Sequence, residues 1–239
     1  MEISGEKSKI LKMGTKEKTT VQIGGEDLET VDQFKYLGAT ITSDAKSVQE
    51  IKIRIAIATS TLANLKPIWR DKNISMKARL SLLRALVHSV FLYGCETWTI
   101  NAEMVKRINA FEMNCMRRIL QIHYSSHTSN KEVRQLMESY IGEQEQLISV
   151  VKRRQLQWFG HVIRWKHSLA NTILQGGTDG KRKRGRPAMC WIDNIKQRTG
   201  LTFEQLIRAA EDREEWKTHV QRSISVAPTA SSYGTEIDR

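Results

Sequence analysis

The sequence has few cysteines and no secretory or membrane-spanning apolar segment. Its three cysteines, Cys95, Cys115 and Cys190, are an odd number and lie far apart, which argues against the disulfide framework of a small secreted protein. The opening residues, MEISGEKSKILK, form no apolar signal region. No apolar run approaches the roughly 18 to 20 residues that a membrane-spanning helix needs. We therefore expect an intracellular chain with reduced thiols and no membrane partner.

The sequence also lacks the residue patterns of several catalytic sites. Phosphoryl transfer by two metal ions needs paired carboxylates on a rigid element, and the chain has no Asp-Asp pair. Glu26-Asp27 is expected at a turn between strands, and Glu211-Asp212 on the polar face of a helix. A serine nucleophile elbow and a phosphate-cradling glycine loop are missing as well. We therefore expect no catalysis by this chain alone and no cofactor in it.

A metal site has weak support in the sequence. Cys115, His123 and His127 are the best candidates, because His-x3-His can place two imidazoles on one side of a zinc ion. No close cysteine pair accompanies them, and Cys95 would have to come from a different helix. His161 is interpreted as a packed or surface residue. The prediction is that the chain holds no metal.

Positive charge is abundant and unevenly distributed. The chain has 38 Lys and Arg against 26 Asp and Glu, a formal net charge of +12. Residues 152–186 hold ten cations and one anion, Asp179, so this segment alone contributes +9. Such a concentration predicts a polyanionic partner, DNA or RNA. The ten cations are Lys152, Arg153, Arg154, Arg164, Lys166, Lys181, Arg182, Lys183, Arg184 and Arg186.

Hydrophobic periodicity predicts a mainly α fold with a small N-terminal β-hairpin element. Residues 1–45 alternate apolar and polar positions, with a turn at Gly24-Gly25 and an end near Ser43-Asp44. Apolar residues at steps of three and four then predict helices over about 48–65 and 76–90. Ser75 and Asn101 are predicted N-caps, and Gly94 is a predicted C-terminal stop.

The second half of the chain is predicted to be helical and basic. A long helix is expected over about 147–165, followed by a flexible glycine-rich loop at 175–187 and two further helices before residue 211. Residues 221–239 are small and polar, and we expect them to be disordered. The predicted divisions are 1–45, 46–140, 141–220 and 221–239.

The sharpest local motif is KRKRGRP, Lys181 to Pro187. Its Arg184, Gly185, Arg186 and Pro187 resemble an AT-hook core, in which an extended Arg-Gly-Arg lies in the narrow minor groove of A·T-rich DNA. A nuclear-localisation signal and a solvated loop are the alternatives. The cations Lys152, Arg153 and Arg154, expected on the exposed side of their helix, would extend the same binding surface by pairing with phosphates.

The tryptophans of the C-terminal half have two interpretations. Trp158, Trp165 and Trp191 share helical faces with aliphatic residues, which favours packing in a core. Stacking on the bases of single-stranded nucleic acid is the alternative. Core packing is the preferred prediction for all three.

An ordered series of motifs resembles the C-terminal part of reverse transcriptases from RTE-type non-LTR retrotransposons. The resemblance covers about residues 1–220, and the motifs are specific as an ordered set. They are EKSKIL (6–11), FKYLGATIT (34–42), IKIRIAIA (51–58), LYGCETWT (92–99), FEMNCMRRIL (111–120), VKRRQLQWFGHVIR (151–164), LQGGTDGKRKRGRP (174–187) and WIDNIKQRTG (191–200).

The resemblance implies roles for several segments. Residues 1–45 would be the late palm, in which Lys7 or Lys9 lies near the incoming nucleotide. Phe34, Lys35, Tyr36, Leu37 and Gly38 would form a hairpin that grips the primer end. The helices of 46–140 would be the thumb, and residues 141–220 the basic C-terminal region. In that family the endonuclease and the Mg²⁺-binding aspartates precede this region, so we expect a nucleic-acid-binding remnant of an RNA-directed DNA polymerase.

Two other functions remain open at this stage. The chain would supply the thumb of an active reverse transcriptase if another retrotransposon-encoded polypeptide completed the palm. It would instead be a helical interaction protein if the basic run served only for nuclear localisation. All these interpretations place the chain in the nucleus or in transit between nucleus and cytoplasm.

Overall fold

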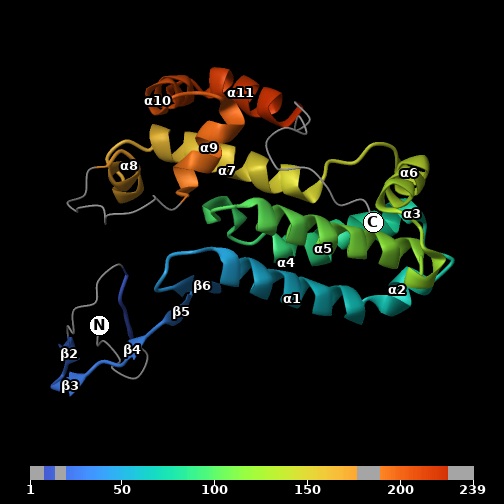
Figure 1. The fold of residues 1–239 in the computed structure, drawn as a ribbon, viewed down its shortest axis with the longest axis horizontal. Helices are drawn as coiled ribbons and strands as arrows, with labels where there is room; N and C mark the ends of the chain where they lie inside the picture. Colours follow the sequence, from blue (N-terminus) through green and yellow to red (C-terminus); the bar gives the residue numbers. More distant parts are fainter. Residues whose placement is uncertain (1–7, 14–19, 177–188, 226–239) are drawn as a thin grey trace.

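The computed structural model describes residues 8–13, 20–176 and 189–225, and it confirms the mainly α fold with a small N-terminal β element. Figure 1 shows helices stacked in layers, with the strands projecting from one side near the start of α1. Among the described residues, no helix is both long and apolar enough to cross a membrane.

The N-terminal strands form three separate pairs. β1 (Ile10–Leu11) pairs in parallel with β4 (Thr30–Val31), while β2 (Gln22–Ile23) and β3 (Glu26–Asp27) form a hairpin across the predicted Gly24-Gly25 turn. Glu26-Asp27 therefore belongs to a strand, where the sequence predicted a turn. β5 (Gln33–Tyr36) and β6 (Ala39–Thr42) form the longest antiparallel pair. No larger sheet joins these pairs within the described residues.

A first hydrophobic core lies among the helices that follow. It is built by α1 (Val48–Asn64), α2 (Lys66–Arg70), α3 (Met76–Leu82), α4 (Ser89–Phe91) and α5 (Ala102–Leu120), with α6 (Asn130–Ile141) at its edge. A π-helical turn (Leu83–His88) connects α3 to α4, and a 3-10 turn (Cys95–Thr97) follows α4. The predicted stripe of α1 is buried, with Ile51, Ala58 and Leu62 at most 1% exposed.

The predicted caps of this bundle are confirmed. The Ser75 hydroxyl accepts a hydrogen bond from the Ala78 amide at 3.2 Å, and the Asn101 side chain accepts one from the Met104 amide at 2.9 Å. Both satisfy amides that have no partner within the first helical turn. Gly94 has a φ of 68°, the left-handed conformation expected of a helix stop.

A second, smaller core lies against the C-terminal half of α7 (Leu147–Arg164). It is completed by α9 (Trp191–Thr199), α10 (Phe203–Glu211) and α11 (Arg213–Ser225), whereas α8 (Leu169–Leu174) packs beside α7. α11 extends five residues into the segment predicted to be disordered, and 226–239 lie outside the described residues.

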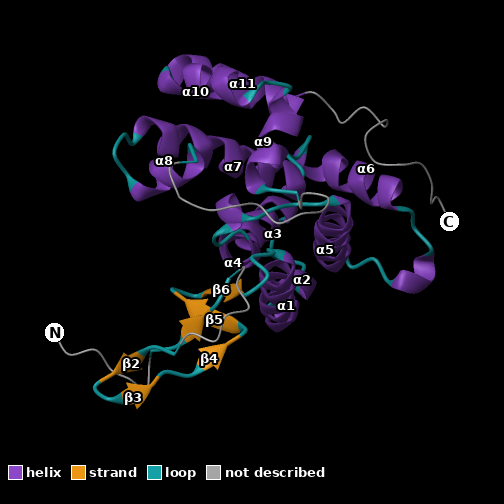
Figure 2. Cartoon of the chain, turned by 60° about the vertical axis from the view of Figure 1, so that its left-hand side comes forward, coloured by secondary structure: helices purple, strands orange, loops and turns teal. Residues whose placement is uncertain are grey.

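α7 contributes to both cores. Its Leu147, Ile148 and Val151 are buried in the first core, and its Leu156, Phe159 and Ile163 are buried in the second. In Figures 1 and 2, α7 lies between the α1–α5 layer and the α10–α11 layer. The two cores therefore meet within one continuous helix.

Candidate nucleic-acid interface

The five residues predicted to grip a primer lie in the β5–β6 hairpin. Phe34, Lys35 and Tyr36 belong to β5, and Leu37 and Gly38 form a two-residue turn with φ of 48° and 84°. Two positive φ values are what a tight type I′ hairpin turn requires. Tyr36 and Leu37 are 58% and 76% exposed, so the hairpin tip presents apolar surface to solvent.

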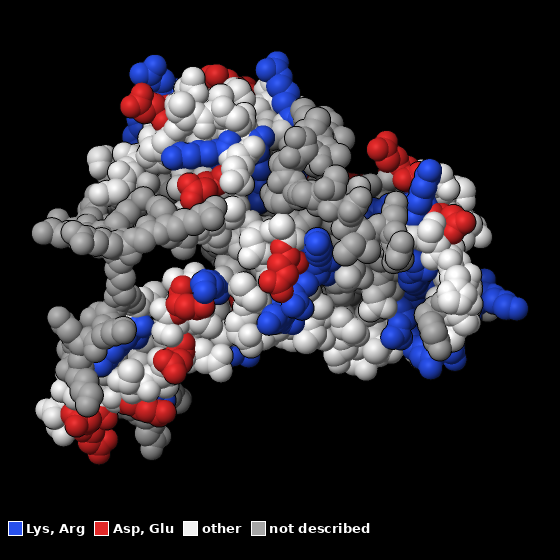
Figure 3. All heavy atoms as spheres, viewed as in Figure 1, with Lys and Arg blue, Asp and Glu red and all other residues white. Residues whose placement is uncertain are grey.

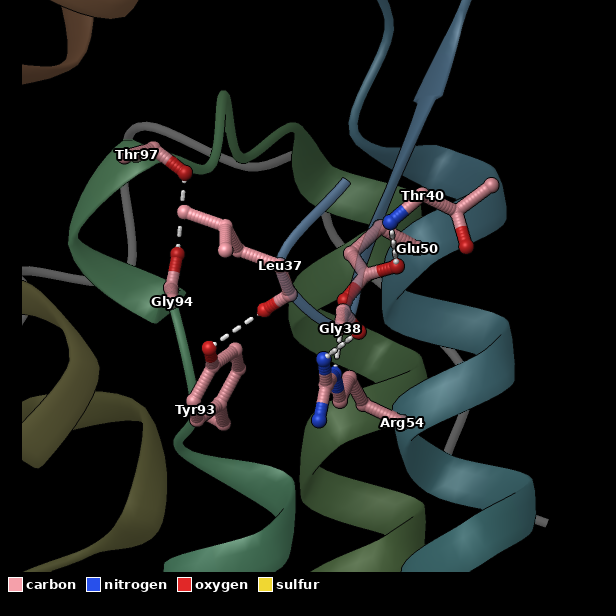
Figure 4. Close-up of polar contacts among 8 residues, drawn as sticks. All are labelled: Leu37, Gly38, Thr40, Glu50, Arg54, Tyr93, Gly94 and Thr97. Atoms are coloured by element: carbon pink, nitrogen blue, oxygen red, sulfur yellow. Dashed lines mark hydrogen bonds and ion pairs between the residues drawn. The ribbon is translucent and has the colours of Figure 1, made fainter. Parts of the chain in front are cut away.

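Three side chains from the helical bundle hold the backbone of this tip (Figure 4). The Tyr93 hydroxyl donates a hydrogen bond to the Leu37 carbonyl at 2.5 Å, and the Arg54 guanidinium donates to the Gly38 carbonyl. The Glu50 carboxylate accepts a hydrogen bond from the Thr40 amide at 2.7 Å. The tip is therefore fixed to the first two turns of α1 and to the segment that follows α4.

Glu50 and Arg54 also bind each other. Arg54 Nε lies 2.6 Å from Glu50 Oε1, with side chains only 9% and 7% exposed, and the guanidinium lies 4.4 Å from the centre of the Tyr93 ring. A buried ion pair adds little net stability, and it offsets the cost of desolvation only when the two side chains are accurately placed. We call Glu50, Arg54 and Tyr93 the hairpin clamp. Sequence reasoning missed it, although the i,i+4 spacing of Glu50 and Arg54 was a usable signal.

The cations predicted on the exposed side of α7 point in different directions. Arg153 makes two hydrogen bonds to the Glu145 carboxylate, at 3.0 and 2.9 Å, and these raise the pKa of the guanidinium. Lys152 is half-buried, and burial, followed by the nearby Arg198, lowers its pKa. Only Arg154 of the three is exposed, and it donates to the Leu92 carbonyl at 3.2 Å. Lys152 and Arg153 are therefore only partly exposed, and phosphate binding by the three cations stays a prediction.

The other cations predicted to bind nucleic acid either lie away from α7 or fall outside the described residues. Lys9 forms an ion pair with Glu29 at 2.5 Å. Lys7 and the whole KRKRGRP motif, Lys181, Arg182, Lys183, Arg184, Gly185, Arg186 and Pro187, lie outside the described residues. Their roles stay predictions.

A different group of cations gathers at the end of the bundle where α1 stops. We call it the basic end: six exposed side chains from α2, the α2–α3 loop, α3, α5 and α6. Figure 3 shows Lys and Arg side chains grouped on that part of the surface. None of the six forms an ion pair with a described residue. They are Lys66, Arg70, Lys72, Lys77, Arg118 and Lys131.

Hydrogen bonds across the bundle bring these elements together. The buried Arg79 donates to the Asp71 carbonyl at 2.7 Å and to the Ile119 carbonyl at 3.4 Å, which joins the α2–α3 loop to the end of α5. The Arg117 guanidinium donates to the Thr128 carbonyl at 2.9 Å, which joins α5 to the segment before α6. Residues separated by up to 65 positions in the sequence therefore share one end of the bundle.

Local helix stability does not account for the basic end. Lys66, Lys77 and Lys131 are the first or second residues of α2, α3 and α6. A helix N-terminus carries partial positive charge, so a cation there costs about 0.3 to 1 kcal/mol at low ionic strength. Two carboxylates of the same segments, Asp71 and Glu132, accept hydrogen bonds from the Asn73 and Ser129 amides, and they reduce the positive charge of the six cations without cancelling it. Sequence reasoning overlooked this signal.

The three tryptophans of the C-terminal half have different environments. Trp191 is half-buried and donates a hydrogen bond to the Glu96 carbonyl at 2.8 Å, as a packed residue would. Trp158 is also half-buried. Trp165 is 56% exposed, so the predicted core packing is wrong for this residue.

The thiols and the candidate metal ligands form no cluster. Burial raises the pKa of Cys95 and of Cys115 to about 12, which makes both poor nucleophiles and poor metal ligands. His123 and His127 are exposed. Within the described ranges, no three His, Cys, Asp or Glu side chains lie together as a metal site would require.

Comparison with known proteins indicates where the chain comes from. It is 27% identical over 240 residues to an uncharacterized transposon-derived protein of Caenorhabditis elegans, and the match covers 94% of this chain and 84% of the relative. No protein-family model and no solved structure matches the chain. The similarity supports a transposon-related origin.

Proposed function

We propose that the chain binds nucleic acid as the thumb and basic C-terminal region of a retrotransposon reverse transcriptase. The transposon-derived relative supports the origin, and the ordered motifs over residues 6–200 support the enzyme class. Its partner is DNA or RNA, and it acts in the nucleus or moves between nucleus and cytoplasm. β5 and β6, which the resemblance assigns to the late palm, pair only with each other within the described residues.

The observation that carries the proposal is the basic end. Six exposed cations without described ion-pair partners lie together, and three of them occupy helix positions that favour anions. Phosphates of a polynucleotide would relieve this unfavourable electrostatics and release condensed counterions on binding. No described carboxylate forms an ion pair with any of the six cations.

The hairpin tip and the basic end lie at opposite ends of α1. This helix has 17 residues, which at 1.5 Å per residue gives a separation of about 25 Å. A duplex rises about 3.4 Å per base pair, so about seven base pairs would reach from one site to the other. The clamp keeps the tip fixed relative to this span because Glu50 and Arg54 belong to α1 itself.

The binding proposal is tested by a mobility-shift titration of a 20-base-pair duplex at several salt concentrations. The triple variant Lys66→Gln, Arg70→Gln and Lys72→Gln removes three of the proposed phosphate contacts. We expect the slope of log K against log salt to flatten by about 3. The matched control is Lys106→Gln, an exposed cation in the first half of α5, about 18 Å along the helix from Arg118. A wild-type affinity that does not depend on salt contradicts the proposal.

Primer extension distinguishes a binding remnant from a polymerase. We expect the pure chain with Mg²⁺ to retain a primer–template duplex without extending the primer. Extension of the primer by the pure chain would contradict the remnant. Extension only after addition of a separate palm polypeptide would instead favour a thumb that completes an active enzyme.

A further inference from the structure

Three aromatic side chains follow one another along the outer face of α7. The rings of Trp158 and His161 stack with centroids 5.4 Å apart and an interplanar angle of 26°, and the rings of His161 and Trp165 lie 5.9 Å apart at 49°. His161 is exposed, and Trp165 is exposed over more than half of its surface. We call these three residues the aromatic ladder. It is available to a ligand because most of Trp165 contributes nothing to either core.

Two open grooves run beside the ladder, and one of them is strongly cationic. One is lined by Glu96, Arg154, Gln157, Trp158 and His161. The other lies between α7 and α11, and its cations are Arg153, Arg164, Arg213 and Lys217. The two grooves share Gln157 and His161, so they meet at the middle of the ladder.

We propose that the aromatic ladder binds unpaired bases of a single-stranded nucleic acid, whose phosphates lie in the flanking grooves. This inference rests on the proposed function and deepens it by adding a second, distinct site with its own partner. Bases in a duplex are stacked and their faces are covered, whereas unpaired bases can stack on tryptophan and histidine rings. None of the six residues of the basic end is aromatic, so these residues offer charge alone and do not distinguish single strands from duplexes.

The charge of the grooves favours a polynucleotide over an apolar peptide. The groove between α7 and α11 carries four cations and one anion, Glu214, a net charge of +3, whereas the other groove carries one cation, Arg154, and one anion, Glu96. Some of these cations already have partners: Arg153 binds Glu145, and Lys217 lies 3.6 Å from Glu214. Arg154 and Arg213 form no ion pair with a described residue, and they line opposite grooves. A single-stranded nucleic acid that crosses the aromatic ladder would therefore contact a guanidinium group on each side.

The test compares Trp165→Ala with Trp165→Phe in the full chain. Binding of a fluorescein-labelled 12-nucleotide oligo(U) and of a 20-base-pair duplex is measured by fluorescence anisotropy at a salt concentration that weakens phosphate contacts. We expect Trp165→Ala to weaken oligo(U) binding about tenfold, because one stacking contact is lost. Trp165→Phe keeps a ring and should retain most of the affinity. Duplex binding should be unchanged in both variants.

The matched control is Leu169→Ala, which removes an apolar side chain that is 74% exposed and lies just after α7. An equal loss of oligo(U) binding in Leu169→Ala would overturn the stacking inference, and so would an unchanged affinity in Trp165→Ala. Loss of self-association in Trp165→Ala, seen by sedimentation, with unchanged oligo(U) binding would assign the face to a second copy of the chain. If duplex binding still responds to the basic-end variants, the proposed function survives any of these failures. If the wild type binds neither ligand, the proposed function itself fails.

Discussion

Leu37 has an unusual backbone conformation for its residue type. A left-handed φ of 48° costs a residue with a Cβ roughly 1 to 2 kcal/mol, and asparagine or glycine is preferred at this turn position. The side chain gains little in return, because it is 76% exposed. The clamp maintains the conformation through the Tyr93 hydrogen bond to the Leu37 carbonyl. Backbone strain of this kind concentrates at binding sites, which agrees with a ligand-contacting role for the tip.

His88 makes the stability of the chain depend on pH. Burial, and secondarily the Arg84 guanidinium, lower the pKa of His88 to about 4, whereas the unfolded value is 6.5. Between pH 6.5 and pH 4, His88 is therefore mostly protonated in the unfolded state and mostly neutral in the folded state. The free energy of unfolding should fall as the pH drops through this window and should not change further below it on account of His88.

The measurement is urea unfolding of the wild type and of His88→Leu at pH 7.5 and pH 5.0. Between pH 7.5 and pH 5.0, we expect the free energy of unfolding to fall by about 2 kcal/mol more in the wild type than in the variant. The buried Glu112, whose pKa burial raises, contributes with the opposite sign but is present in both proteins and cancels. The variant should also be more stable at pH 7.5, since the buried His88 Nε2 has no hydrogen-bond partner among the described residues. Equal pH dependence in the two proteins would contradict this assignment.

At the scale of the elements, Gly160 sets the distance between α7 and α11. A Cβ at this position would lie 2.3 Å from Trp216 Cδ1 and 2.4 Å from its Nε1. The indole cannot move easily, because it is 3% exposed and donates a hydrogen bond to the Leu156 carbonyl at 2.8 Å. We expect Gly160→Ala to lower the free energy of unfolding by about 3 kcal/mol through overpacking.

The comparison for Gly160→Ala is Gln157→Ala, an exposed position one turn earlier on the same helix. It should change the free energy of urea unfolding by less than about 0.5 kcal/mol. An alanine normally stabilises a helix interior by about 1 kcal/mol relative to glycine. If Gly160→Ala instead raised the free energy of unfolding by that amount, α11 would not pack this closely against α7.

The sequence predicted elements better than it predicted sites. Apolar spacing and caps are local, so α1, α3, α5 and α7 could be placed from residues a few positions apart. The hairpin clamp joins Arg54 to Gly38 and Tyr93 to Leu37, and the basic end joins α2 to α6. These contacts depend on tertiary packing, which has no local signature. The three neighbouring cations at 152–154 were predicted to share one exposed side, but consecutive residues of a helix point 100° apart, so they face different directions.

At the scale of the whole molecule, two buried amides attach the second core to the first. The Gln155 side chain donates to the carbonyls of Cys95 and Trp98, at 3.2 and 2.8 Å. The Asn194 side chain accepts from the Ile100 amide at 2.7 Å and donates to the Ile100 carbonyl at 2.9 Å. These bonds occupy backbone groups of the segment after α4, so the second core is attached by polar contacts as well as by α7.

The unequal sizes of the two cores predict that they open separately. The first core contains 20 buried residues and the second contains nine, so the second has less apolar area to resist local unfolding. Leu206 is fully buried in the second core, and Leu206→Ala should cost about 3 kcal/mol there. In native-state hydrogen exchange, the amides of α10 and α11 should then exchange about a hundredfold faster, while those of α5 keep their wild-type rate. Equal acceleration in α5 would mean that α7 couples both cores into one cooperative unit, because loss of its C-terminal half would then unfold its N-terminal half as well.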